Sequence, residues 1–207
     1  MADYGILRNT TNTGLTSELI AILTAPVSIK SNRPDFVSDS LSLKRRAVIS
    51  ENQRWEISGG LQPFDNVGEF FANLIVNGNS TPFYIRVPQI YRSTRIPDNL
   101  TPSTSSSYAA GGNTVTVSNM GAYTLPVGEF VRFANHSKVY MVKQAIYDGG
   151  VNHLTLFPKL HAPLAINEAM TYGSKVTMGV YYDESVSLEY QDGILVTINN
   201  VTFIESL

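Results

Sequence analysis

The sequence predicts a mainly β protein, in which a β-barrel or sandwich with one flanking helix carries a smaller, inserted barrel of five strands. Three observations lead to this fold class. Short segments alternate apolar and polar residues with a period of two, clusters of glycine, proline, asparagine and serine separate them, and one segment shows a strong helical stripe. At 207 residues the chain is long enough to bury a core in one large domain or two modest ones.

The first 35 residues have two interpretations. The sequence SELIAILTAPVSI can form a short helix or a strand, and residues 31–34 are typical of a turn. The segment is either an ordered leader that packs on the first domain or an arm that crosses to an adjacent subunit. We expect no signal peptide, because no basic region precedes an apolar one, and no membrane helix, because the longest apolar run covers only residues 19–23.

Three strands are predicted in the first 90 residues, near 37–44, 54–58 and 83–87. In each of them apolar residues occupy alternate positions and therefore share one face. The second strand carries Trp55 on its apolar face and is expected to end at the Gly59–Gly60 pair. This position predicts that Trp55 is a core residue, with an interface anchor as the alternative.

One helix is predicted over residues 66–77. Its apolar residues recur at i, i+3, i+4, i+7 and i+8, a spacing that forms a single stripe, which we expect to pack on the first barrel. Asn66 and Glu69 resemble a capping box, and Gly78 supplies the stop. The stripe consists of Val67, Phe70, Phe71, Leu74 and Ile75.

The second half of the chain begins with a segment, 92–112, whose proline, serine and glycine content predicts a loop or linker. Five short strands are predicted after it, and their number is typical of an OB-like barrel. They lie near 113–119, 128–135, 138–147, 153–158 and 174–181, with a longer excursion over 162–173. The last 25 residues predict a hairpin, because alternating segments flank the turn signal Asp192–Gly193.

A set of residues in this half of the chain resembles a known family. They are Gly128, Phe133, His136, Lys138, Val139 and Tyr140, then Leu156, Pro158 and Leu160, and at the end Glu205, Ser206 and Leu207. With the order of strands, helix, linker, small barrel and final hairpin, they resemble the distal tail proteins of long-tailed bacteriophages, in the branch that carries an OB-fold insertion. The resemblance covers the chain from about Val37 to the end.

This resemblance implies a discontinuous tail-tube-like barrel domain, made of residues 1–93 and 179–207, and an inserted OB-fold-like domain of residues 94–178. It implies a structural virion protein, assembled in the host cytoplasm, that forms a ring at the distal end of the tail. A hexamer is the expected ring. The ring would connect the tail tube to the baseplate hub or receptor-binding apparatus and leave a channel for DNA.

The resemblance also implies which partners the chain binds. They are other copies of the chain, the tail tube protein, and baseplate hub or tail fibre proteins, with DNA only in passage and no membrane. Tube adaptors of contractile-tail baseplates share the tube barrel, and they stay an alternative.

Charge is sparse in this sequence. The formal net charge is −2 and 15% of the residues are charged, which argues against a dedicated nucleic-acid binder. The basic cluster Lys44, Arg45 and Arg46 is a candidate intersubunit contact. A solvated or edge strand and a nucleic-acid contact are its alternatives.

The C-terminal segment is acidic. From Asp183 onward the chain contains five carboxylates and no lysine or arginine. In the resembled family the C-terminal hairpin belongs to the barrel that surrounds the DNA channel, and like-charged walls would repel phosphates. We therefore expect some of these carboxylates, above all Glu189 and Asp192, to face the bore; an ordinary acidic outer face is the alternative. The others are Asp183, Glu184 and Glu205.

We predict no catalytic, cofactor-binding or metal-binding residues and expect no enzyme. The chain has no cysteine, and His136, His153 and His161 lack metal-ligand spacing. His136, in a predicted hairpin turn, and His153, at a predicted strand start, are expected to be structural. The Gly-x-Ser-x-Gly, P-loop and Gly-x-Gly-x-x-Gly motifs do not occur. The pair Asp183–Glu184 is expected to be solvated or to face the lumen.

Two other functions compete with a structural one. An OB-like insert could bind host glycan or single-stranded nucleic acid, although the nucleic-acid version needs a basic groove and the insert has only a slight basic excess. A tail-associated hydrolase would need convergent carboxylates, which the sequence does not display.

Overall fold

The computed structural model describes residues 6–8, 19–34, 36–39, 45–48, 52–63, 82–88, 96–97, 99–182, 187–191 and 194–207. These residues form fifteen strands and one turn of 3-10 helix, so the predicted mainly β class is confirmed. The helix predicted over 66–77 lies outside the described residues. No helix in the described part of the chain is both long and apolar enough to span a membrane.

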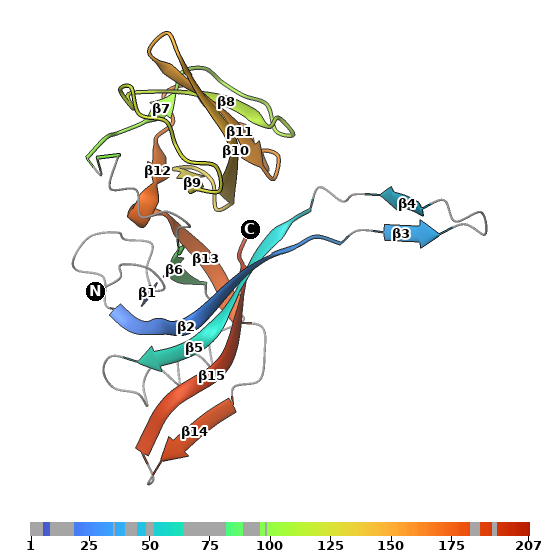
Figure 1. The fold of residues 1–207 in the computed structure, drawn as a ribbon, viewed down its shortest axis with the longest axis vertical. Helices are drawn as coiled ribbons and strands as arrows, with labels where there is room; N and C mark the ends of the chain where they lie inside the picture. Colours follow the sequence, from blue (N-terminus) through green and yellow to red (C-terminus); the bar gives the residue numbers. More distant parts are fainter. Residues whose placement is uncertain are drawn as a thin grey trace.

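The first sheet has seven strands and curves back on itself (Figure 1). Its strands are, in spatial order, β13 (Thr177–Tyr182), β6 (Phe83–Arg86), β1 (Ile6–Arg8), β2 (Leu19–Asn32), β5 (Arg54–Pro63), β15 (Ile194–Glu205) and β14 (Ser187–Gln191). β13 also pairs with β15, so six of the strands form a closed circuit of pairings and β14 extends beyond it. The alternation of Phe83, Ile85 and Val87 places all three in the core, as predicted.

β2 and β5 form the longest strand pair of this sheet. The sequence SELIAILTAPVSI, which was compatible with helix or strand, lies mainly in β2. The predicted end of the second strand at Gly59–Gly60 is wrong, because β5 continues to Pro63. Gly59 lies opposite a β-bulge of β2, and a Cβ there would be 3.3 Å from the carbonyl oxygen of Thr24. The glycine thus permits a close backbone approach at the bulge and does not break the strand.

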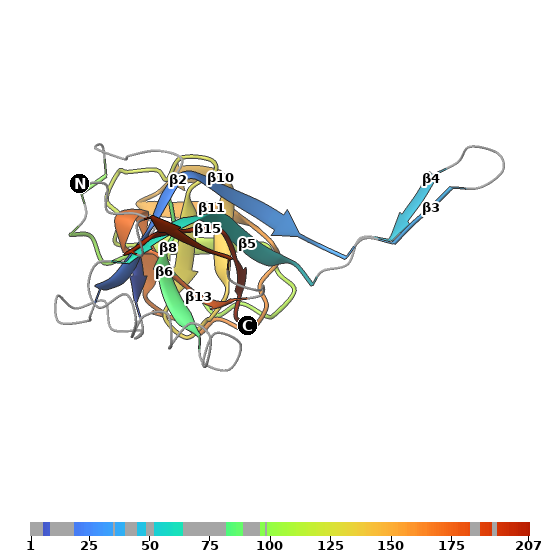
Figure 2. The same ribbon diagram turned by 90° about the horizontal axis from the view of Figure 1, so that it is seen from below.

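Beyond β2 and β5 the chain continues into a separate hairpin, which we call the arm. It consists of β3 (Phe36–Asp39) and β4 (Arg45–Val48), paired in antiparallel register. In both ribbon views the arm projects away from the rest of the molecule (Figures 1 and 2). Among the described strands, β3 and β4 pair only with each other.

The second sheet has six strands and closes almost completely into a barrel. Its strands are, in spatial order, β12 (Met170–Tyr172), β9 (Phe130–Phe133), β10 (Val139–Asp148), β11 (Val151–Phe157), β8 (Thr114–Ser118) and β7 (Ser103–Thr104). A bridge between Ser103 and Ala169 joins the two edges. The amide of Met170 also donates to the carbonyl of Pro102 at 2.9 Å. The barrel has its own core, which includes Val115, Phe133 and Leu154.

The strand composition of this barrel differs from the prediction. The strand expected near 174–181 corresponds to β13, which pairs with β6 and β15 in the first sheet. Its buried side chains Met178 and Val180 belong to the first core. The barrel is completed by β7 and β12, which lie in segments predicted as linker and excursion and are too short for a period of two to be visible.

The first sheet therefore draws strands from both ends of the chain, up to Arg86 and from Thr177 on, and the barrel uses the residues between. The two crossings lie next to each other, since the amide of Val87 donates to the carbonyl of Val176 at 3.0 Å. The predicted C-terminal hairpin forms between β14 and β15, with Leu188 opposite Ile198. The second half of β15 pairs with β5 and β13, so the hairpin is anchored in the first sheet.

Candidate functional site

The most distinctive site in the described part of the chain is a buried junction between the two sheets. Its apolar part is built around Trp55 of β5, which is buried as predicted. The indole lies edge-on to Phe130 of the barrel with ring centroids 5.1 Å apart and to Phe157 with centroids 6.0 Å apart. Its Nε1 donates to the carbonyl of Val139 at 2.8 Å, so the one tryptophan is bound to both sheets.

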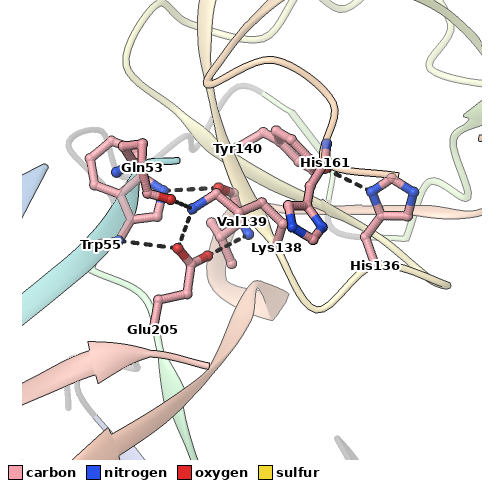
Figure 3. Close-up of polar contacts among 8 residues, drawn as sticks. All are labelled: Gln53, Trp55, His136, Lys138, Val139, Tyr140, His161 and Glu205. Carbon is pink, nitrogen blue, oxygen red and sulfur yellow. Dashed lines mark hydrogen bonds and ion pairs between the residues drawn. The ribbon is translucent and has the colours of Figure 1, made fainter. Parts of the chain in front are cut away.

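The polar part of the junction is an ion pair between Glu205 and Lys138 (Figure 3). Glu205 is the last residue of β15, and Lys138 directly precedes β10 in the barrel. The carboxylate also accepts the backbone amide of Val139 at 2.8 Å and that of Trp55 at 3.1 Å. The Lys138 Nζ donates in addition to the carbonyl of Gln53 at 2.6 Å. Both charges are thus held by partners from the opposite sheet.

Burial and pairing act in opposite directions on these two groups. Removal from water raises the pKa of Glu205 and lowers the pKa of Lys138, while each partner and the amide donors favour the charged forms. Glu205 is 0% exposed and Lys138 2% exposed, so either charge would be stranded without the other. This arrangement makes the pair a strong restraint on how the two sheets meet.

A second network lies beside the junction, inside the barrel. The Tyr140 hydroxyl accepts the backbone amide of His161 at 3.1 Å and lies 2.8 Å from Nδ1 of His136. If the hydroxyl donates to Nδ1, the proton of the neutral imidazole is on Nε2, which is 3.2 Å from the carbonyl of Pro163. Burial raises the pKa of Tyr140 to about 12, so the hydroxyl keeps its proton at neutral pH. This network fits the predicted structural role of His136.

Another buried acid lies where the barrel returns to the first sheet. Glu129 precedes β9, is 1% exposed, and interacts with the backbone amide of Gly173 in the 3-10 turn Gly173–Lys175. Burial raises the pKa of this carboxyl to about 7. Among the described residues, its Oε2 has no hydrogen-bond partner. A carboxyl with a pKa of about 7 changes its protonation near neutral pH, so the charge of Glu129 depends on pH in this range.

The residues predicted as sites are distributed over distant parts of the molecule. Arg45 and Arg46 lie in β4 of the arm, and Glu189 lies in β14. Lys44, Asp183, Glu184 and Asp192 lie outside the described residues. His153, expected to be structural, has Nδ1 3.0 Å from the Thr116 hydroxyl.

Glu205 is not among the C-terminal carboxylates that could line a channel. Its carboxylate is fully buried within a single chain and engaged by Lys138, so it cannot face a bore. The placement of Glu189 and Asp192 around a channel concerns an assembled ring and stays a prediction.

Sequence reasoning did not find the ion pair itself. Lys138 and Glu205 are 67 positions apart, and neither lies in a charge pattern from which the other could be identified as its partner. The one available signal was that both belong to the residues that carry the family resemblance.

The polar groups of the junction hold the two sheets together. Its carboxylate, ammonium and indole donor are directed at one another or at backbone groups. In the part of the chain that the structure describes, no group of three or more histidine, aspartate or glutamate side chains could hold a metal ion. No protein-family model matches this chain, and no curated protein is significantly similar to it, so function has to be inferred from sequence and geometry.

Proposed function

We propose that this chain is a structural component of a bacteriophage tail that assembles into a ring at the distal end, with a hexamer as the expected state. The ring connects the tail tube to the baseplate hub or receptor-binding apparatus and surrounds a channel for DNA. Its work is done by surfaces that bind neighbouring copies and neighbouring ring proteins, without chemical turnover.

The observation that carries this proposal is the location of several residues on which the family resemblance depends. Lys138, Val139 and Glu205 make the ion pair and its amide contacts. The next residue, Ser206, donates its amide to the carbonyl of Gly179 at 2.8 Å, and Tyr140 and His136 form the adjacent network. Residues far apart in the sequence thus meet at a buried junction between the two sheets, and this supports the resemblance in architecture.

The arm supports the self-assembly part of the proposal. A two-stranded hairpin has marginal stability in water unless other strands or a core cover it. The arm extends away from both cores of its own chain (Figures 1 and 2). A neighbouring subunit would supply the cover that the described part of the chain does not.

Native mass spectrometry of the purified chain, combined with negative-stain imaging, tests this proposal. We expect a closed ring. A matched variant in which a short Gly-Ser loop replaces residues 36–48 should fold but stay monomeric, because it lacks the arm and keeps the junction. A wild-type chain that is monomeric at all concentrations would contradict the proposal. An armless variant that assembles as well as wild type would contradict the part that the arm is proposed to play in assembly.

A second candidate function has one observation in its favour. Among the described residues, exposed large apolar side chains concentrate on the barrel and its loops. They are Tyr123, Val127, Ile146, Tyr147 and Ile166. Exposed aromatic rings can stack on sugars or bases, so the barrel could be a module that binds host glycan or single-stranded nucleic acid. A monomer that binds an oligonucleotide or a glycan in a mobility-shift or calorimetric titration would favour this candidate over the ring.

A further inference from the structure

Among the described strands, the arm has no neighbour beyond its own two strands. β3 and β4 pair residue by residue, from Phe36 opposite Val48 to Asp39 opposite Arg45, and no other described strand pairs with either of them. Each therefore presents an outer row of backbone donors and acceptors, which is a template for pairing with another strand.

The first sheet presents a complementary edge. Its other six strands form a circuit through the β13–β15 pairing, whereas β14 has a single described neighbour, β15. The outer side of β14 is thus the free edge of this sheet in the described part of the chain. β14 lies at the far end of the molecule from the barrel (Figure 1).

The stretches of sequence that contain these two edges are opposite in charge. Residues 36–48 contain Lys44, Arg45 and Arg46 against the single acid Asp39. Residues 183–192 contain four carboxylates and no basic residue. Opposite charge on two strand edges favours their association and disfavours pairing of like edges.

We infer that the arm of one copy docks on the β14 edge of a second copy of this chain. Basic residues of β4 would lie close to the carboxylates of the β14–β15 hairpin. This inference rests on the proposed ring and names the surfaces that build it. The contact joins two different surfaces, so it repeats head to tail and closes into a ring when the rotation between copies allows it.

The geometry of one chain favours a contact between copies over a contact within a chain. The arm is the continuation of the β2–β5 ribbon and points away from the sheet to which β14 belongs (Figures 1 and 2). Among the described strands, the arm does not pair with β14 of the same chain. A neighbouring copy can offer its β14 edge without a change in this arrangement.

A charge exchange tests the inference. Arg45→Glu with Arg46→Glu should weaken assembly about tenfold or more, and Glu189→Lys with Asp192→Lys should do the same, because each brings like charges together in the inferred contact. The fourfold variant should recover most of the assembly, since it restores opposite charges with the signs exchanged. Native mass spectrometry over a concentration series measures each apparent dissociation constant.

Because the chain has no cysteine, introduced thiols give a second and independent readout. One chain carries Ala47→Cys in β4 and a second chain carries Ser187→Cys in β14. Mixed and oxidised, they should form a heterotypic disulfide dimer. A control chain with Ser106→Cys, at an exposed position of the barrel, should not cross-link to the Ala47→Cys chain.

The outcomes separate this inference from the proposed function. A ring that forms normally in both charge-reversal variants and shows no Ala47–Ser187 cross-link would overturn the docking inference and leave the ring standing. If only the Glu189 and Asp192 variant is harmless, those carboxylates do not hold the arm, and the docking inference is equally wrong. A wild-type chain that never assembles would overturn the proposed function first, and the docking inference with it.

Discussion

The junction and the arm use charge in opposite ways. At the junction, Glu205 and Lys138 are buried from water, and each is bound by groups of the opposite sheet. On the arm, basic residues lie on a hairpin that pairs only with itself among the described strands. A buried pair restrains one arrangement strongly, because separating it strands a charge. Charges on a projecting hairpin steer and select a partner at little cost to folding.

The comparison leads to a simple division. Substitutions at the junction should change the free energy of unfolding, and substitutions on the arm should change assembly.

Removal of the barrel should have the largest effect. The ends to be joined lie close together, because Val87 and Val176 are hydrogen bonded, so residues 89–175 can be replaced by a short Gly-Ser linker. The remaining sheet should unfold cooperatively but lose at least roughly 3–5 kcal/mol, since Trp55 loses its packing against the barrel. Chemical denaturation followed by circular dichroism measures this.

The same variant tests the predicted discontinuous domain. A product without a cooperative transition, next to a well-folded fragment of residues 1–178, would show that the division into residues 1–93 with 179–207 and 94–178 is wrong.

Breaking the ion pair should have the next largest effect. Glu205→Ala leaves the Lys138 ammonium buried beside two unpaired backbone amides, and should cost about 3–5 kcal/mol of unfolding free energy. Replacing both partners, as in Lys138→Met with Glu205→Leu, should cost clearly less than Glu205→Ala alone, because no charge remains to be buried. If the single and the double variant are equally destabilised, the pair is not the restraint described above.

Glu129 should make stability depend on pH. The pKa of its carboxyl is about 7 in the folded chain and near 4.5 in the unfolded chain. Between these two pH values the folded state therefore holds a proton that the unfolded state has lost. Stability is therefore full below about pH 4.5, falls as pH rises towards 7, and is lower by on the order of 3 kcal/mol above that. Glu129→Gln should flatten this decline in denaturation curves recorded from pH 4 to pH 8. A variant that retains the wild-type slope would show that the decline comes from other groups.

The arm should have the smallest effect on folding. Arg45→Glu with Arg46→Glu should change the unfolding free energy of the monomer by less than about 0.5 kcal/mol, as is usual for surface substitutions. Measurement at a concentration below that of assembly separates folding from association. A loss as large as that of Glu205→Ala would mean that the arm belongs to the core of its own chain.

Several features of this fold could be predicted from local patterns. The alternation of Phe83, Ile85 and Val87 indicates a half-buried strand, and the structure places all three in a core. The Asp192–Gly193 signal predicts the hairpin that β14 and β15 form. These predictions succeed because period and turn chemistry act over a few residues.

Other features could not be read locally. Gly59–Gly60 has the composition of a strand end, yet it lies within β5 because the opposite strand bulges against it. β13 follows the barrel directly in sequence, yet its pairing with β6 and β15 places it in the first sheet. In both cases the structure of the segment is determined by a partner strand that is far away in the sequence.

By itself, the sequence determined the mainly β class, most of the strands and the burial of Trp55, because side-chain alternation and turn residues depend on near neighbours. Tertiary structure alone decided which strands share a sheet and which charges share a partner. No local pattern in the sequence pairs Lys138 with Glu205. They become the restraint between the sheets only because β5, β10 and β15 converge on one buried point, where water cannot replace either partner.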